Sequence, residues 1–196
     1  MKYLFKITLC GVNDPSVWRK FAVPADYTFK RFHKAIQVAF GWENLHSFEF
    51  YDGTGGDGDM HIIMPHEDDL KSEDKDFTDA SKTRLHDVFS DNKRRFTYRY
   101  DSNDNWTHEI ELEEISDDFI KCPQCYEGEG MCPPEGCGGV AGYEHIKMIF
   151  REKPGSDEYI RCREWLFMED DDEFDPYYFT EEEVAEANEI YERYFR

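Results

Sequence analysis

Apolar and polar positions near the start of the chain alternate in the pattern of two paired strands. Residues 3–12 and 17–23 each hold apolar side chains at strand spacing. A turn at 13–16, which contains Pro15, separates the two runs. The pattern therefore predicts a β-hairpin at the beginning of the chain.

The apolar spacing then changes to the period of an amphipathic helix. Thr28 or Asp26 can cap its start, and apolar side chains recur at helical spacing up to Phe40. Gly41 ends the helix, because glycine tolerates left-handed backbone geometry, and a third strand is predicted at 46–51. This order of elements predicts an α+β fold with a β-grasp-like mixed sheet packed on an amphipathic helix.

The second half of the chain extends this core by a second hairpin and C-terminal helices. Residues 96–100 and 106–112 alternate as two strands joined by a polar turn. In the helical C-terminal part, 142–196, the spacing predicts three helices at 142–152, 157–168 and 180–195. Thr180 stands three residues before Glu183, which is the spacing of a capping box at the start of the last helix.

The segment between the two hairpins has a different character. Residues 52–82 hold four glycines and many carboxylates, which is typical of a long acidic, Gly-rich insertion. An apolar stretch at 60–64 can add an edge strand inside it, and residues 85–89 predict a helical turn after it. The sequence has no internal repeat, so we expect residues 1–196 to form a single domain.

Composition adds a strongly acidic surface to this picture. The chain has 196 residues, with 44 acidic and 23 basic side chains, a formal net charge of −21 and a mean hydropathy of −0.81. Aromatic residues make up 16% of the chain, and each buried ring removes roughly 150–250 Å² from water. We therefore expect an aromatic core beneath an acidic exterior.

The charge and hydropathy also narrow the range of partners and locations. Proteins bind nucleic acid largely through Lys and Arg, so a net charge of −21 argues against a general nucleic-acid binder. No stretch has the roughly 20 apolar residues that a membrane span needs. The N-terminus becomes polar too soon for a signal peptide. We expect a cytoplasmic protein whose partner is another protein.

Four of the six cysteines lie within sixteen residues. Cys122, Cys125, Cys132 and Cys137 have the spacing C-x2-C-x6-C-x4-C in a Cys-rich loop, 121–139. Thiolates bind zinc tetrahedrally at about 2.3 Å, so the loop can form a structural zinc site. The alternative is a set of reduced thiols, with one pair forming a disulfide on oxidation. No other cofactor is expected.

Carboxylates and imidazoles gather around the turn of the second hairpin. Asp101, Asp104 and His108 can bind a divalent metal or act as acid and base, and His46 is a further candidate. The competing interpretation is a turn whose Asp side chains bond backbone amides, with His108 hydrogen-bonded in the core. No hydrolase, P-loop or dinucleotide-binding motif is present, so we assign no catalytic residue.

Several sequence blocks in the right order resemble the plasmid pRiA4b ORF-3-like family. The blocks are Trp18-Arg19 with Val23-Pro24-Ala25-Asp26 and Ala39-Phe40-Gly41-Trp42-Glu43, Tyr100-Asp101 with Asp104, Trp106, His108 and Glu109, Cys132-Pro133-Pro134-Glu135 with Gly142-Tyr143-Glu144, and Phe174-Asp175-Pro176. The resemblance implies an α+β fold that occurs in plasmid, mobile-element and chromosomal proteins of bacteria and archaea. It brings no established activity.

The chain departs from the family pattern in two places. Ser102-Asn103 stands where the family has Phe-Gly in the turn of the second hairpin. Cys122 lies outside the family's third block, so the resemblance does not imply a site with four thiolates.

Three functional interpretations follow. The first is a non-enzymatic protein-interaction module with a structural zinc site in the Cys-rich loop. The second is a metal-dependent enzyme that uses His46, Asp101, Asp104 and His108. The third is a passenger protein of a mobile element, associated with transposition or a resolvase, which rests on the family resemblance alone and is opposed by the charge. We favour the first and lean against an enzyme.

Overall fold

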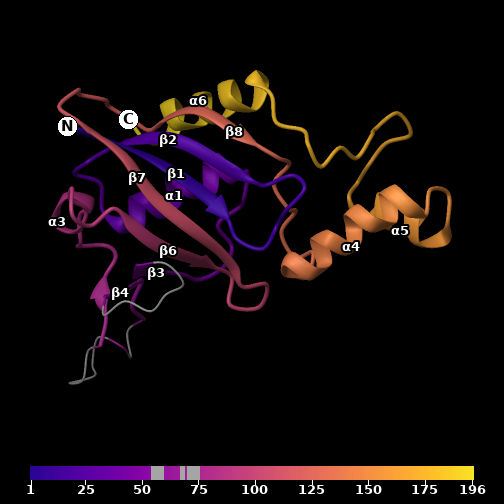
Figure 1. Ribbon diagram of the computed structural model, residues 1–196, viewed down its shortest axis with the longest axis horizontal. Helices are drawn as coiled ribbons and strands as arrows, with labels where there is room; N and C mark the ends of the chain where they lie inside the picture. The colour runs from indigo at the N-terminus through magenta and orange to yellow at the C-terminus, as the bar shows by residue number, and fades with distance from the viewer. Residues whose placement is uncertain (54–59, 67–68, 70–75) are drawn as a thin grey trace.

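The computed structural model describes residues 1–53, 60–66, 69 and 76–196, and its centre is one eight-stranded sheet (Figure 1). The strands are β1 (Lys2–Leu9), β2 (Trp18–Pro24), β3 (Phe48–Asp52), β4 (His61–Ile63), β5 (Thr78–Asp79), β6 (Arg95–Tyr100), β7 (Trp106–Ser116) and β8 (Gln124–Glu129). The helices are α1 (Phe29–Phe40), α3 (Leu85–Val88), α4 (Gly139–Glu152), α5 (Asp157–Trp165) and α6 (Glu181–Tyr194).

The strands lie in the order β5-β4-β3-β6-β7-β1-β2-β8. All neighbours are antiparallel except β4 and β5, so the sheet is mixed. Strand β1 lies between its hairpin partner β2 and the distant β7, with Lys2 opposite Ser116 and Leu9 opposite His108. The predicted α+β fold, with a mixed sheet, an amphipathic helix, a second hairpin and C-terminal helices, is confirmed.

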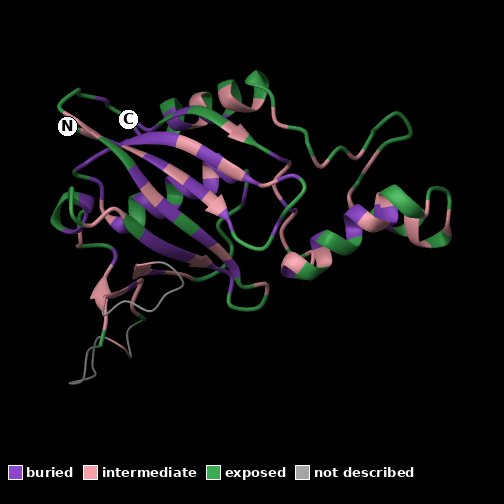
Figure 2. Cartoon of the chain, in the orientation of Figure 1, coloured by how far each residue is buried: buried purple, intermediate pink, exposed green. Residues whose placement is uncertain are grey.

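Helix α1 covers one face of the sheet and begins and ends where the sequence predicts (Figure 1). Thr28 Oγ1 accepts a hydrogen bond from Arg31 N at 3.3 Å, and Gly41 has a φ of 70°. Buried positions alternate with more exposed ones along β1 and β7 (Figure 2). Between helix and sheet lie fully buried rings: Phe5, Phe21, Phe29, Phe32, Phe50 and Phe96. Each such ring stabilises the fold by roughly 1.5–3 kcal/mol.

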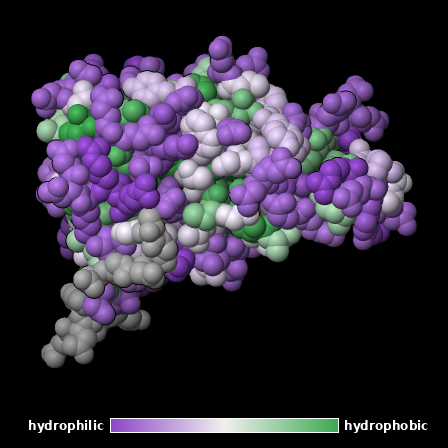
Figure 3. All heavy atoms as spheres, in the orientation of Figure 1, coloured by the Kyte–Doolittle hydropathy of each residue, from purple (hydrophilic) through white to green (hydrophobic). Residues whose placement is uncertain are grey.

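The opposite face of the sheet is polar. Lys20 Nζ lies 3.1 Å from Glu113 and 2.7 Å from Glu127, and Arg99 Nη1 lies 2.9 Å from Glu49. Hydrophilic residues dominate the view in Figure 3. Exposed ion pairs of this kind contribute about 0–1 kcal/mol each, so the aromatic side of the sheet supplies most of the stability.

Helix α6 closes the β8 edge of the sheet. Asn188 Nδ2 donates to Cys125 O at 3.0 Å, and Cys125 N donates to Asn188 Oδ1 at 2.8 Å. Tyr191 is fully buried, and its hydroxyl donates to Ala35 O of α1 at 2.7 Å. The side chain of Asn188 thus takes the place of a neighbouring strand at the edge of β8.

Two segments differ from the sequence prediction. Strand β8 occupies 124–129 within the predicted Cys-rich loop, 121–139, because this segment adds to β2 and buries Cys125 against α6. Helix α5 ends at Trp165 instead of 168, because Phe167 has a left-handed φ of 54° that a helix cannot continue through.

Three smaller predictions complete the comparison. The capping box of α6 is present, since Thr180 N donates to Glu183 Oε2 at 2.8 Å. None of the described helices is long and apolar enough to cross a membrane. Part of the predicted insertion at 52–82 lies outside the described residues, namely 54–59, 67–68 and 70–75.

Candidate functional site

The four clustered cysteines lie on different segments of the fold. Cys122 lies just before β8, Cys125 lies within β8 and is hydrogen-bonded through its backbone to Asn188 of α6, and Cys137 lies just before α4. Cys137 Sγ donates to Gly139 O at 3.8 Å. Within the described ranges, no three or more His, Cys, Asp or Glu side chains are arranged to hold a metal ion. A structural zinc site formed by these cysteines and Cys132 therefore stays a prediction.

Burial keeps these thiols protonated. It raises the pKa of Cys125 to about 11 and the pKa of Cys132 to about 12, although the nearby Arg19 guanidinium acts in the opposite direction. Burial also raises the pKa of Cys137 to about 12. Because zinc binds thiolates, any metal would have to displace these protons, and binding would strengthen with rising pH.

One predicted pair of the polar cluster is present. His46 Nε2 lies 3.6 Å from Asp101 Oδ2, and the Asp101 side chain is nearly buried. Asp101 also shapes the turn, since it has a φ of 56° and its Oδ1 accepts a hydrogen bond from Asn103 N at 2.9 Å. This carboxylate therefore organises the hairpin turn and lies beside one imidazole.

The other two residues of the predicted cluster, Asp104 and His108, lie in different parts of the fold. Asp104 Oδ2 accepts from Gly138 N at 3.2 Å, at the start of α4, where a carboxylate suits the helix dipole. His108 is fully buried, and neither of its ring nitrogens meets a described hydrogen-bond partner of normal geometry. Aromatic rings with centroids 4.9–5.3 Å away surround it, from Phe40, Trp42 and Tyr98. The four residues do not converge on one cleft.

Arg19 is a buried cation that joins three segments of the chain. Its Nε donates to Ala39 O at 3.0 Å, Nη1 to Glu129 O at 2.9 Å and Nη2 to Gly130 O at 3.0 Å. The guanidinium also lies 3.9 Å from the centre of the Phe179 ring. These contacts with α1, β8 and the segment before α6 give Arg19 a structural role.

An arm formed by α4 and α5 stands away from the sheet (Figure 1). It has a small core of its own, formed by Ile146, Ile149 and Cys162. This second core lets the arm hold its shape at a distance from the main one. The sequence predicts both helices but not their separation from the sheet.

The outer end of the arm exposes apolar side chains. Ile160 is 49% exposed, Trp165 is 45% exposed and Phe167 is 93% exposed, and we call these three residues the arm surface. Phe167 has a positive φ, a conformation that costs a non-glycine residue about 1–3 kcal/mol and that clusters at functional sites. Single exposed apolar residues are ordinary, but three within eight residues make this end of the arm a candidate for interaction, with Ile160 and Trp165 on different sides of α5.

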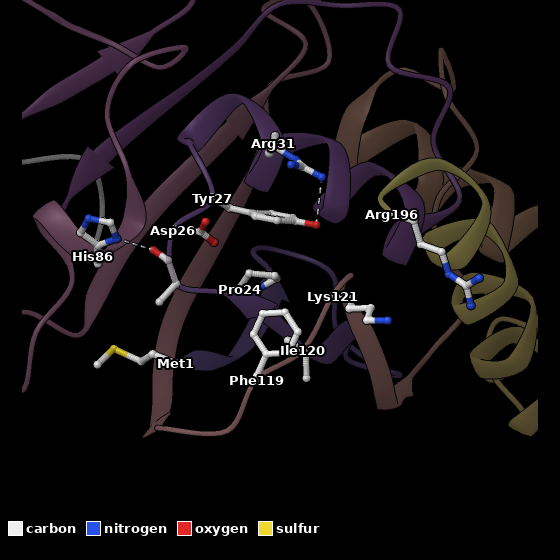
Figure 4. Close-up of a pocket in the computed structure, with 11 residues that line it drawn as sticks. Met1, Pro24, Asp26, Tyr27, Arg31, His86, Phe119, Ile120, Lys121 and Arg196 are labelled. Carbon is white, nitrogen blue, oxygen red and sulfur yellow. Dashed lines mark hydrogen bonds between the residues drawn. The ribbon is translucent and has the colours of Figure 1, made fainter.

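A hollow of about 1080 Å³ lies near the two ends of the described chain, away from the arm (Figures 1 and 4). We call it the basic pocket, after the side chains on its lining: Arg31, His86, Lys121 and Arg196. Sequence reasoning missed it, because segments far apart in the chain build it. A weak signal existed in Phe119 and Lys121, an exposed aromatic and a cation close together in an acidic chain.

Comparison with known proteins places the chain among relatives without a stated activity. A sequence profile described as "Plasmid pRiA4b ORF-3-like protein" matches residues 1–183. An uncharacterized protein of Sinorhizobium fredii is 31% identical over 178 residues, which cover 85% of this chain and 81% of that protein. The crystal structure of a protein of unknown function from Methanosarcina mazei matches with a TM-score of 0.75 and 33% identity, over 93% of this chain and 97% of that one.

Proposed function

The chain belongs to the plasmid pRiA4b ORF-3-like family, and on this premise we propose that it is a non-enzymatic module that binds a protein partner through the arm surface. The observation that carries the proposal is Phe167, a large aromatic side chain that is 93% exposed. Aromatic residues, Phe among them, are enriched at protein interfaces relative to the rest of the surface.

The end of the arm is held in place before any partner arrives. Phe167 N donates to Glu164 O at 3.2 Å, and Met168 N donates to Arg163 O at 3.0 Å. The Arg163 guanidinium in turn donates to Asp172 O at 2.8 Å. A side chain on a fixed backbone loses little conformational entropy on binding, so this arrangement favours association.

Charge defines the chemistry of the partner. Residues 169–173, which follow the arm surface, are all acidic. The complementary partner is a protein with an apolar depression bordered by Lys and Arg side chains. Two aromatic rings bury roughly 300–500 Å², which is less than the roughly 1,200–2,000 Å² of a stable interface. We therefore expect a transient complex or one that uses more of the arm.

A helical peptide of Leu and Lys residues is a suitable probe of this surface. Trp165 is the most exposed of the four tryptophans, since Trp42 and Trp106 are buried and Trp18 is half-buried, so a change in tryptophan fluorescence that is absent in a Trp165→Phe variant reports binding at the arm. We expect Phe167→Ser to weaken binding at least about fivefold, as for a hot-spot residue worth more than about 1 kcal/mol. The same peptide with Glu in place of Lys should not bind.

Tyr194→Ser is the matched control, because Tyr194 is a 71% exposed aromatic residue on α6 and not on the arm. It should leave the affinity for the Leu-Lys peptide unchanged. Equal affinities of the Phe167 and Tyr194 variants would contradict the proposal, since they would mean that the peptide binds through general charge attraction.

A structural zinc ion in the Cys-rich segment is a separate part of the proposal. The C-x2-C pair of Cys122 and Cys125 supports it, as does a glycine-rich connection to Cys132 and Cys137. Native mass spectrometry of protein purified under reducing conditions tests it. One bound zinc that is lost in Cys132→Ser is the expected result, and folded protein without metal would contradict it.

A further inference from the structure

We propose that the basic pocket binds an amphiphilic anion, a small molecule with a carboxylate or phosphate head and an apolar body. The pocket lies at the opposite end of the molecule from the arm (Figure 1). The inference is therefore independent of the proposed protein-binding function. Four features of the pocket carry it: its unpaired cations, its apolar wall, its low content of carboxylates and its size.

Two cations of the pocket lack a carboxylate partner. Arg31 Nη2 donates to Tyr27 Oη at 3.1 Å and to Phe195 O at 2.9 Å, and its guanidinium lies 4.1 Å from the centre of the Tyr27 ring (Figure 4). These contacts fix the side chain but leave its charge unbalanced. In the described ranges, no carboxylate lies within ion-pair distance of Arg31 or Lys121.

Other cations in the described ranges, such as Lys34 and Arg193, also have no carboxylate within ion-pair distance. What distinguishes Arg31 and Lys121 is that both line the same hollow. Two unpaired cations on the wall of one hollow make it a place of positive potential on an otherwise acidic molecule. An anion is the ligand that this potential attracts.

The remaining charged groups on the lining are already engaged. Arg196 Nη2 lies 2.9 Å from Glu192 Oε2, and the Nδ1 atom of His86 lies 3.1 Å from Ala25 O. Asp26 supplies the carboxylate on the described lining. Its Oδ2 lies 4.0 Å from Arg84 Nη1, which offsets its charge. Among the charged side chains of the described lining, those left to meet a ligand are therefore the Arg31 guanidinium and the Lys121 ammonium.

An apolar wall lies opposite Arg31, and Lys121 follows it in the chain on the same side of the hollow (Figure 4). Phe119 and Ile120 lie across the hollow from Tyr27 and Arg31 (Figure 4). Ile120 is 8% exposed and Tyr27 is 4% exposed, whereas Phe119 is 78% exposed. A ligand with an apolar body would cover the Phe119 ring, and each buried CH₂ group contributes roughly 0.8 kcal/mol.

The size of the hollow favours a small molecule. Its volume of about 1080 Å³ is near the upper end of the roughly 300–1,000 Å³ of ligand pockets, which are mostly apolar with a few polar groups that orient the ligand. Carboxylate and phosphate heads share the chemistry that Arg and Lys recognise.

Isothermal titration calorimetry with ligands that share one octyl-length tail tests the proposal. Octanoate and octyl phosphate should bind the full chain with one-to-one stoichiometry. Octanol and octylamine should bind at least tenfold more weakly, because they carry the tail without the negative charge. Whichever anion binds more tightly identifies the preferred head group. The proposal would be overturned if neither anion binds, or if octanol binds as tightly as octanoate.

Variants of the pocket complete the test. Lys121→Gln and Phe119→Ala should each weaken binding of the anions at least fivefold. Both side chains are exposed and make no described hydrogen bond, so the thermal midpoint should stay unchanged and rule out unfolding. Lys34→Gln is the matched control, since Lys34 is an exposed cation of α1 that does not line the pocket. Equal affinities for the Lys121 and Lys34 variants would show that only net charge matters and would contradict the proposal.

Discussion

Two histidines are buried in the aromatic core, where burial disfavours the charged form of the imidazole. His33 Nδ1 lies 2.8 Å from Tyr98 Oη, its Nε2 bonds to Asn44, and burial lowers its pKa to about 4. His108 lies deeper among the rings, and burial lowers its pKa to about 3. Both imidazoles are therefore neutral at pH 7, although the sequence marks His108 as a candidate acid or base.

The free energy of unfolding should fall as the pH is lowered below about 6.5. In the unfolded chain both imidazoles have a pKa near 6.5, so they bind protons that the folded chain does not. This contribution is complete above pH 6.5 and is lost as the pH falls toward the folded pKa values of about 4 for His33 and 3 for His108. Each histidine contributes up to about 1.4 kcal/mol per pH unit, which urea denaturation at pH 7, 6 and 5 can measure.

A leucine at position 108 should flatten this pH dependence. His108→Leu removes one of the two groups and also removes a buried polar side chain whose ring nitrogens meet no partner of normal hydrogen-bond geometry among the described residues, so stability at pH 7 should not fall. His145→Leu changes an exposed histidine of α4 and should keep the slope of the parent protein. Identical slopes for the two variants would contradict the assignment.

The thiols should differ in reactivity according to their burial. Cys10 is exposed, although partial burial of its thiol and the nearby Glu109 raise its pKa, whereas Cys125 is 4% exposed and burial raises its pKa to about 11. Since the thiolate is the reactive form, iodoacetamide at pH 8 should modify Cys10 first and should reach Cys125 only after denaturation. Peptide mass mapping over time measures the modification rates of both thiols. Comparable rates in the folded protein would argue against the buried position of Cys125.

Elements with their own apolar repeat or cap could be predicted from the sequence. Strands β1, β2, β6 and β7 alternate, and helices α1 and α6 carry their capping residues. Strand β8 could not be predicted, because Cys125 is its one buried side chain and its partners come from β2 and α6. The basic pocket and the arm surface depend on how elements that are distant in the sequence are placed relative to one another. Local periodicity holds no information about that placement.

Removing the Asn188 side chain should test the closure of the β8 edge. Asn188→Ala deletes both hydrogen bonds to the Cys125 backbone, so the free energy of unfolding should fall by about 1–3 kcal/mol. Glu189→Ala, at the neighbouring exposed position of α6, should change it by less than about 0.5 kcal/mol. Urea denaturation of both variants measures the two losses of stability. Equal losses would mean that α6 holds the β8 edge by packing alone.

The charge of the whole molecule bears on the interpretation of the chain as a passenger protein of a mobile element. A net charge of −21 repels the phosphate backbone of DNA, and the repulsion is strongest at low salt, where the charges are least screened. We expect no retention of the protein on immobilised duplex DNA at 50 mM salt, where a basic DNA-binding protein would be held strongly. Retention that weakens with added salt would contradict this prediction and would revive a role in transposition.

The position of β1 between β2 and β7 has a consequence for how the protein folds during synthesis. Its two partners are β2, a few residues away, and β7, whose residues 108–116 pair with residues 2–9. Ribosomes add roughly 5–20 residues per second, so on the order of 10 s pass between the synthesis of β1 and the synthesis of β7. During that interval the nascent chain presents an open strand edge and an aromatic face. We expect a chaperone that binds extended apolar segments to raise the yield of folded protein during translation in vitro, and an unchanged yield would argue against such an exposed intermediate.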